Sequence, residues 1–323
     1  MVTVTVKDIA RETGYSVPTV TAVLRNKARE LQIKPSTEKL ILETAEKLGY
    51  VKSDLALEMR TGQSKTIVIL RPHATHEFIF TVTEQSEIIA SQHGYHIRTV
   101  INTASSGSDD FAGILRKIVS MRPAAIITCT DFGSDKPMLA EWVRKHKLPW
   151  LGLDYYEPDA DITAVTDDRT GIDLSIEYLH SLGHTRIIHA TDTLKAQYAD
   201  IRYRAFLDSM RSRGLDVDES LCFHDYFLDA SNLKQFVERI AAMKNPPTAI
   251  SCGSDYMAVK LLMLLPYCGL RVPKDISLIA YGGLAFRNLC VPALTAVYQP
   301  FDQLVDQAIR ELLKMIRKEP YQN

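Results

Sequence analysis

The first fifty residues carry two closely spaced helix patterns, and this feature limits the possible folds more than any other. Apolar Val6, Ile9 and Ala10 repeat at helical spacing. Thr5 precedes them as a residue that caps helices, and Gly14 follows as a residue that ends them. The segment therefore predicts a short amphipathic helix, on which the small Ala10 allows a neighbouring helix to approach closely.

A second helix is predicted directly after this one. Ser16 can cap it, and Pro18 falls in its first turn, where a missing N–H removes no helical hydrogen bond. Val20, Val23 and Leu24 form its buried stripe. A tight helix pair of this kind is the module that lays its second helix in the major groove of DNA, although similar pairs occur in proteins that bind no DNA.

The sequence also predicts which face of the second helix is exposed to a binding partner, and it predicts a third helix. The face of the second helix that we expect to meet a partner carries Val17, Pro18, Thr21, Ala22 and Arg25. The third helix follows Pro35-Ser36, and its expected core face is Leu40, Ile41, Ala45 and Leu48.

Beyond a polar stretch at 51–65, the pattern alternates between short apolar runs and longer helical segments. Such alternation predicts a doubly wound parallel α/β sheet, and the number of runs suggests two lobes. The expected strands are 67–70, 124–127, 187–190, 248–251 and 276–280. The expected helices include 84–93, 169–182, 254–268 and 301–317.

Composition indicates a cytoplasmic protein with a modestly basic head. Residues 1–65 hold 11 Lys and Arg against 8 Asp and Glu, whereas the remainder holds 27 against 31. This asymmetry suits phosphate contact at one end, but an excess this small is equally typical of a solvated surface. The five cysteines show no C-x-x-C or metal-ligand spacing, which favours reduced thiols. No signal peptide pattern precedes the headpiece, and the longest apolar segment, 261–265, is too short for a bilayer.

Enzyme chemistry is disfavoured by the motifs. The nine histidines are scattered without H-E-x-x-H spacing, and neither G-x-S-x-G nor a phosphate-binding loop occurs. We expect no catalytic residues, no metal and no cofactor.

Five motifs, in order, resemble the LacI/GalR family of bacterial repressors. The resemblance implies a helix-turn-helix headpiece at 1–50, a hinge helix and linker at 51–65, and a two-lobed periplasmic-binding-protein-like domain at 66–323 that binds effector and dimerises. It also implies crossovers near 161, 291 and the C-terminus. The family's last strand is lacking after 301–317, and the absence of a leucine heptad tail favours a dimer. The motifs are VKDIARETGYSVPTVT at 6–21 with AEKLGY at 45–50, VTDDRTG at 165–171, LGHTRI at 182–187, GLRVPKDIS at 269–277 and PALT at 292–295.

The resemblance also assigns DNA-contacting positions. Val17 and Pro18 would offer apolar contact to bases, and Ala22 cannot make the guanine contact of the usual arginine. Arg25 is the expected cation, reaching either a base or a phosphate. The hinge segment places Met59 as a minor-groove wedge, with a plain linker helix as the alternative. The expected DNA-binding set is Thr5, Val6, Ser16, Val17, Pro18, Thr19, Thr21, Arg25, Asn26 and Met59.

A ligand cleft is implied in the same way. Arg202, in the sequence RYRAF at 202–206, supplies a planar donor fork suited to vicinal hydroxyls or a carboxylate. Gly282 stands where relatives carry an aspartate, which would leave Arg202 without its usual neighbour and could favour an anionic ligand. The expected ligand-binding set is Phe78, Asp154, Arg202, Tyr226 and Ser254. The alternatives are a surface salt bridge for Arg202, a loop carboxylate for Asp154, core packing for the two aromatic residues and a helix cap for Ser254.

The sequence therefore predicts a DNA-binding transcription regulator, a repressor, whose operator affinity is set by a small ligand, first of all a sugar or sugar derivative. Its expected partners are duplex operator DNA, the effector and a second copy of the chain. The alternative is a solute-binding or sensory receptor of the same fold that has lost DNA binding.

Overall fold

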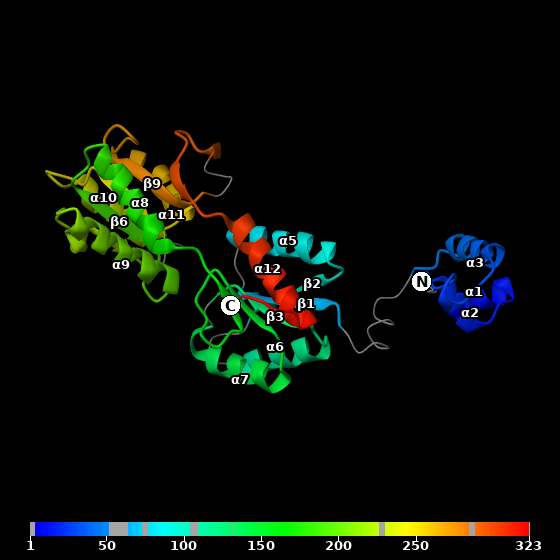
Figure 1. The fold of residues 1–323 in the computed structure, drawn as a ribbon. Helices are drawn as coiled ribbons and strands as arrows, with labels where there is room; N and C mark the ends of the chain where they lie inside the picture. The colour runs from blue at the N-terminus through cyan, green and yellow to red at the C-terminus, as the bar shows by residue number, and fades with distance from the viewer. Residues whose placement is uncertain are drawn as a thin grey trace. The chain divides into compact units, whose positions relative to one another are not determined.

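The computed structural model describes residues 4–51, 64–72, 77–103, 109–130, 132–225, 230–283 and 288–322. The chain divides into two compact units, Met1–Gln63 and Ser64–Asn323, drawn in blue and in cyan to red in Figure 1. Within the described residues, no helix is both long enough and apolar enough to cross a membrane.

The described residues of the first unit, 4–51, form a bundle of three short helices, as the sequence predicts. They are α1 (Val6–Thr13), α2 (Val17–Val23) and α3 (Pro35–Lys47). Ile9, Val20 and Ile41, one from each helix, meet in its core and are almost completely buried. The expected terminus of α1 is confirmed, because Gly14 follows it with a φ of 70°.

Two headpiece positions differ from expectation. Ala22 was expected on the partner face but is buried, because the chain turns back after α2 and the amides of Arg25 and Lys27 both bond to its carbonyl. Leu40 was expected in the core but is 45% exposed. The buried face of α3 runs instead through Ile41 and Thr44, whose hydroxyl is satisfied by the carbonyl of Leu40.

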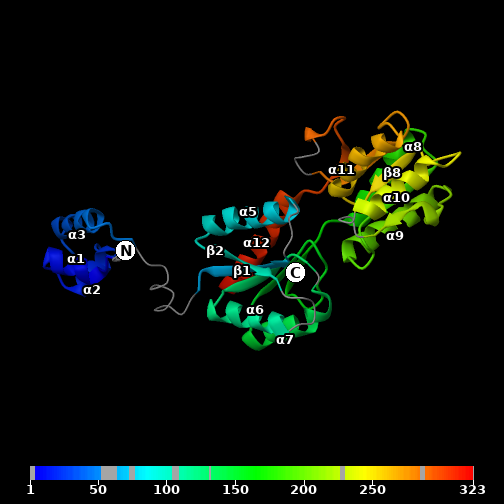
Figure 2. The same cartoon turned by 180° about the vertical axis from the view of Figure 1, so that it is seen from behind.

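The second unit begins with a five-stranded parallel sheet in the order β2-β1-β3-β4-β5. Alternating side chains of β1 point to opposite faces, so Ile67 and Ile69 pack under α5 and α12, whereas Val68 and Leu70 pack under α6 and α7. Figures 1 and 2 show the two helix pairs covering opposite faces of this sheet. The strands are β1 (Thr66–Pro72), β2 (His96–Asn102), β3 (Ala125–Thr128), β4 (Trp150–Leu153) and β5 (Ile162–Ala164). The helices are α5 (Glu77–Gln92), α6 (Asp109–Ser120), the 3-10 turn η1 (Gly133–Asp135), α7 (Lys136–His146) and α12 (Phe301–Arg317).

A second parallel sheet, in the order β10-β9-β8-β6-β7, forms the other lobe. Its strands are β6 (Ile187–Thr191), β7 (Phe223–His224), β8 (Ala249–Cys252), β9 (Ser277–Gly282) and β10 (Thr295–Tyr298). Its helices are α8 (Asp168–Ser181), α9 (Gln197–Ser212), α10 (Ala230–Ala241) and α11 (Asp255–Leu264), with 3-10 turns η2 (Glu219–Leu221) and η3 (Leu265–Cys268). The two sheets and their helices confirm the expected two-lobed doubly wound fold.

The chain passes between the lobes after β5 and again after β10, because α12 belongs to the core of the first lobe. These passages lie within about ten residues of the expected positions near 161 and 291. After α12, the described residues 318–322 contain no strand.

Candidate functional site

Arg202 is held at the carboxyl edge of the second sheet. Its side chain is 7% exposed, and it projects from α9 toward the strand ends. One terminal nitrogen, Nη1, donates to the carbonyl of Gly253 at 2.7 Å, and the other, Nη2, donates to Oδ1 of Asp168 at 3.0 Å. Gly282 provides no carboxylate, as the sequence indicates, but Arg202 is paired with a different acidic residue. Asp168, at the start of α8, supplies the carboxylate that Gly282 does not.

Two tyrosines enclose the guanidinium of Arg202. The Tyr281 ring centroid lies 4.3 Å from its central carbon, and the Tyr198 ring centroid lies 5.0 Å away. The Tyr281 hydroxyl donates to the same Asp168 oxygen at 2.8 Å, and the Tyr198 hydroxyl donates to Asp192 at 2.9 Å. A charged fork between aromatic faces is a surface that suits polyhydroxylated or flat ligands.

The backbone conformation at Gly282 and the adjacent Asp255 side chain both disfavour the family's aspartate at this position. Its φ of 133° is one that side chains rarely adopt, and a Cβ there would lie 2.9 Å from Oδ2 of buried Asp255. An aspartate introduced at Gly282 would also bring two carboxylates together. The glycine is therefore part of a different local arrangement, in which Asp255 fills the space beside the strand end.

Asp154 brings a carboxyl group from the first lobe to the same cluster. It follows β4 with a φ of 63° and is partly buried. Burial raises the pKa of Asp154 to about 7; the Arg202 cation opposes the rise and the Asp168 carboxylate adds to it. Asp154, Arg202 and Asp168 are thus close enough to influence one another's charge.

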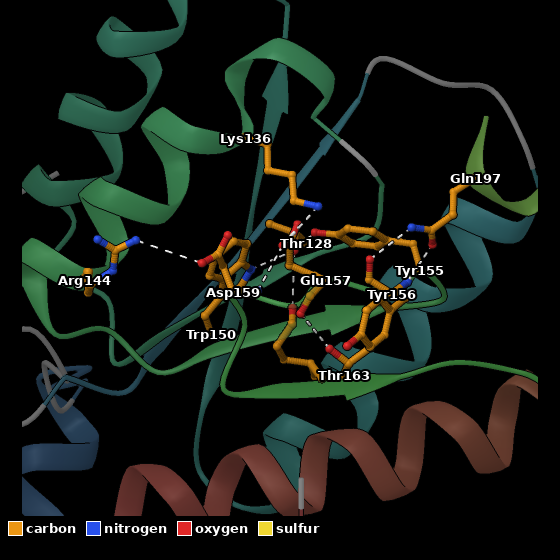
Figure 3. A network of polar contacts seen from close by, with 11 residues as sticks. Thr128, Lys136, Arg144, Trp150, Tyr155, Tyr156, Glu157, Asp159, Thr163 and Gln197 are labelled. Atoms are coloured by element: carbon orange, nitrogen blue, oxygen red, sulfur yellow. Dashed lines mark hydrogen bonds and ion pairs between the residues drawn. The ribbon is translucent and has the colours of Figure 1, made fainter. Parts of the chain in front are cut away.

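A polar network fixes the loop that carries Asp154 (Figure 3). On one side the Tyr155 hydroxyl lies 2.6 Å from the Thr128 hydroxyl, which also accepts from the indole of Trp150 at 2.8 Å. On the other side the amide of Tyr156 donates to the Gln197 side chain at 2.8 Å, and that side chain donates back to the Tyr156 carbonyl at 3.1 Å. Since Gln197 begins α9, this exchange ties the Asp154 loop to the helix that carries Arg202.

The next residue of the loop is anchored by a buried ion pair, also drawn in Figure 3. Glu157 has a side chain that is 1% exposed, and its carboxylate lies 3.3 Å from the Lys136 ammonium. The Thr163 hydroxyl donates to the Glu157 carbonyl at 3.0 Å. The loop after β4 is thereby fixed from α7, β5 and α9 together.

We expect the stability of the folded protein to depend on pH through Asp154. The folded protein keeps the Asp154 proton up to about pH 7, whereas the unfolded chain releases it near the ordinary pKa of 3.8. The free energy of unfolding therefore falls as pH rises between these values, because the folded state binds more protons there. Asp154→Asn should match the wild type at pH 3 and exceed it by about 1–3 kcal/mol at pH 8 in denaturant unfolding. A difference that is the same at every pH would contradict this assignment.

The other expected ligand residues have mixed outcomes. The Ser254 hydroxyl accepts the Met257 amide at 3.2 Å, so it caps α11, and a ligand contact would have to share it. The side chain of Phe78 and all of Tyr226 lie outside the described residues, as does Met59 of the hinge.

Sequence reasoning missed Asp168 and Tyr281 of the Arg202 cluster, and also Arg71, a residue near the carboxyl end of β1 in the other lobe. Asp168 lies in the motif at 165–171, which was read as a family signature rather than as a source of a ligand-side carboxylate. Tyr281 and Arg71 end strands of their sheets, and the carboxyl ends of parallel strands are where ligands bind. That rule could have selected both. Arg71 donates to the Pro72 carbonyl at 3.2 Å, and its Nε is buried without a hydrogen-bond partner among the described residues.

Apart from the buried Ala22, the start and the exposed face of α2 agree with the sequence prediction. The Ser16 hydroxyl accepts the Thr19 amide at 3.3 Å, and Pro18 lies in the first turn. Ahead of α1, the amide and hydroxyl of Thr5 both donate to Asp8, at 2.9 and 2.7 Å, and these bonds lower the pKa of Asp8. The expected DNA-binding positions that the structure describes are all exposed or half-exposed; they are Thr5, Val6, Ser16, Val17, Pro18, Thr19, Thr21, Arg25 and Asn26.

Comparison with known proteins decides the family. Residues 5–53 match the profile of the bacterial regulatory proteins of the lacI family, and residues 176–323 match that of the periplasmic binding protein-like domain. The chain belongs to the LacI family. Both the headpiece and the lobed domain of this LacI-family protein are therefore recognised independently, in the order that the sequence motifs indicate.

Individual relatives span almost the whole LacI-family chain. The HTH-type transcriptional repressor PurR of Escherichia coli O1:K1 / APEC is 27% identical over 322 residues, covering 98% of this chain and 92% of PurR. The crystal structure of the lac repressor dimer bound to operator and the anti-inducer ONPF superposes with a TM-score of 0.84 at 20% identity, covering 98% and 94% of the two chains. A LacI family transcriptional regulator from Bifidobacterium animalis subsp. lactis DSM 10140 gives 0.69 at 20% identity, covering 81% and 93%. The structural likenesses concern the fold, and the relatives are repressors and regulators rather than enzymes.

The described part of the LacI-family chain contains no cluster of His, Cys, Asp and Glu side chains arranged to hold a metal ion. None of its five cysteines forms a disulfide bond, and Cys129, Cys222 and Cys252 are buried. Burial raises the pKa of all three, to about 12 for Cys129 and about 11 for Cys222.

Proposed function

We propose that this protein is a sequence-specific transcriptional repressor whose affinity for operator DNA is set by a small effector bound at Arg202. The observation that carries the proposal is the headpiece. A capped α2 presents an exposed N-terminal face on a three-helix core, the arrangement in which a recognition helix enters the major groove. The intact core and caps also favour this function over a receptor that has lost DNA binding.

The exposed face of α2 suggests how the operator is read. Ser16, Thr19 and Thr21 offer hydroxyls and helix N-terminal amides to phosphates. Val17, 40% exposed, and Pro18 offer apolar contact to thymine methyl groups. Arg25, which is half-exposed after α2, is the cation for a base or a phosphate. We place Thr5, Val6 and Asn26 at the edges of the same contact.

For the effector we propose a neutral sugar or sugar derivative. Tyr198 and Tyr281 provide ring faces, and Arg202 a hydrogen-bonding fork. Because Asp168 already pairs with Arg202, the cleft is less suited to an anion than the sequence suggested. Asp154 and Ser254, together with Phe78 and Tyr226 from outside the described residues, complete the proposed site.

The proposed operator complex contains a homodimer in the cytoplasm. Two-fold protein symmetry would be matched by a pseudo-palindromic site with half-sites about one helical turn apart. Sequencing the genomic fragments retained by the purified chain tests this directly. We expect such a site among the retained fragments and an affinity that falls steeply with salt. Retention without any shared sequence would contradict the proposal.

The proposed wedge role of Met59 gives a separate prediction. Met59→Ala should weaken binding to the selected operator about tenfold or more and reduce its bend angle, because an apolar wedge supplies the kink. Arg60→Ala is the matched control, since a flanking cation mainly contacts phosphate. Bend angles from circular-permutation retardation check the comparison. An unchanged DNA bend angle with Met59→Ala would contradict the wedge role and favour the alternative, a plain linker helix.

A further inference from the structure

Two adjacent strands of the second lobe change from apolar to polar toward their carboxyl ends. In the parallel register, Ile187 of β6 pairs with Ala249 of β8, and two residues further His189 pairs with Ser251. Side chains two residues apart lie on the same face of a strand, so Thr191 shares the face of His189. This face is the one under α9, because the Phe206 ring stacks on the His189 ring at 5.2 Å.

These polar side chains are buried without the hydrogen bonds that burial normally requires. His189 and Ser251 are 0% exposed, and Thr191 is 1% exposed. The hydroxyls of Thr191 and Ser251 and both ring nitrogens of His189 make no well-formed hydrogen bond among the described residues, although the Ser251 backbone comes close enough to the His189 ring to act on its pKa as a hydrogen-bond partner. Nε of Arg202 is in the same condition. Since the large majority of buried polar side-chain atoms in proteins have a partner, either protein or ordered water, five such atoms in one place indicate an occupant.

The unpartnered atoms lie directly behind the effector site. Arg202 donates to the Gly253 carbonyl at 2.7 Å. A Cβ on Gly253 would collide with the Thr191 side chain and would lie 3.3 Å from Nε2 of His189. Gly253 therefore lies against Arg202, Thr191 and His189 at once, and the polar strand face continues the Arg202 cluster inward beneath α9.

The chemistry of this face is that of a neutral, mixed donor and acceptor. Burial, with the nearby Arg202 cation and His224, lowers the pKa of His189 to about 3. The imidazole is therefore uncharged at physiological pH, with one donor and one acceptor nitrogen. The two hydroxyls can each do both, and Arg202 adds an N–H. A ligand hydroxyl, which both donates and accepts a hydrogen bond, matches such a set. An anion would be repelled by the acceptor lone pairs, and a cation would be repelled by Arg202.

We propose that His189, Thr191 and Ser251 form a subsite that receives a hydroxyl-bearing arm of the effector and determines which effector the protein accepts. The inference rests on the proposed effector site at Arg202 and extends it inward. The shared chemistry of a ligand hydroxyl and a buried water makes ordered water the competing occupant. Effector affinity distinguishes the two occupants. If a ligand hydroxyl fills the subsite, substitutions of these side chains change the affinity for the effector, whereas if water fills it they do not.

The test uses the full chain and calorimetric titration with D-pentoses, D-hexoses, their monodeoxy analogues, hypoxanthine and guanine. The sugar that binds the wild type most tightly becomes the probe. His189→Phe, which keeps a ring against Phe206, and Ser251→Ala should each raise its Kd about tenfold or more. The ligand-free melting temperature of His189→Phe should not fall, because a lone buried polar group is replaced by an apolar one.

Ser86→Ala is the matched control. Ser86 is also 0% exposed with an unpartnered hydroxyl, but it lies on α5 in the other lobe. This variant should bind the probe as the wild type does. One monodeoxy analogue of the probe should bind the wild type at least about tenfold more weakly than the probe, and this difference should disappear in Ser251→Ala or His189→Phe.

Three results would overturn the subsite. The first is that both variants bind the probe as Ser86→Ala does, which would leave only buried water. The second is that every deoxy analogue loses the same affinity in wild type and variants. The third is that a purine base, and no sugar, binds the wild type. In each case, if Arg202→Met no longer binds the ligand that binds the wild type, the proposed effector site at Arg202 is still supported and only the subsite is rejected.

Discussion

Arg202→Met should abolish the effect of ligand on operator affinity and weaken ligand binding by more than about 100-fold. Arg202 is the cation of the proposed effector site, and charge-assisted hydrogen bonds from a guanidinium are among the strongest polar contacts that a protein can offer a ligand. Methionine keeps much of the side-chain volume between Tyr198 and Tyr281. Titration of the purified variant with the sugar panel, with and without operator, measures both effects.

The same substitution should destabilise the protein by about 3–5 kcal/mol, because it leaves the Asp168 carboxylate, 12% exposed, without its counter-charge. Arg202→Met combined with Asp168→Asn removes that lone charge and should recover part of the loss in denaturant unfolding. Neither variant should respond to ligand. If Arg202→Met, shown to be folded by circular dichroism, still releases operator on addition of ligand, the effector site lies elsewhere.

Removing residues 1–63 should eliminate specific operator binding, a loss of at least about 10³-fold, while ligand binding survives. The two units have separate hydrophobic cores, one around Ile9, Val20 and Ile41 and the other in the two lobes. The fragment 64–323 should therefore fold and bind the sugar with unchanged affinity. Calorimetry and gel retardation on the same preparation check both statements. Retention of the operator by the fragment would place DNA recognition outside the headpiece.

The elements that were predicted well are those whose signals are local. Capping residues mark the starts of α1 and α2, Gly14 marks the end of α1, and apolar runs identified the central strands β1, β3, β6, β8 and β9. Five strands were missed, namely β2, β4, β5, β7 and β10. Edge strand β2 has mostly exposed positions and β7 has only two residues, whereas β4 is buried throughout but is only four residues long. The prediction that Leu40 lies in the core was wrong, because the helices that pack against α3 decide which of its faces is buried. The hydrophobic periodicity of α3 alone does not decide this.

The site was predicted only in part because its geometry depends on residues far apart in the sequence. Arg202 was identified, but its pairing with Asp168 depends on how α8 and α9 meet at the edge of the sheet. Nothing local to Gly282 indicates that Asp255 fills the neighbouring space. Ser251 and His189 lay inside runs that predicted buried strands, and their polarity became informative only when the register placed them side by side.

The effect of a bound sugar on operator affinity is the most direct test of coupling between the effector-binding unit and the headpiece. Operator affinity of the full chain, determined at one fixed salt concentration with and without each sugar, should change about 5- to 150-fold for at least one sugar. The same sugar should leave the operator affinity of Arg202→Met unchanged. If no sugar alters the operator affinity of the wild type, or if the change persists in Arg202→Met, an effector-controlled repressor acting through this cleft is contradicted.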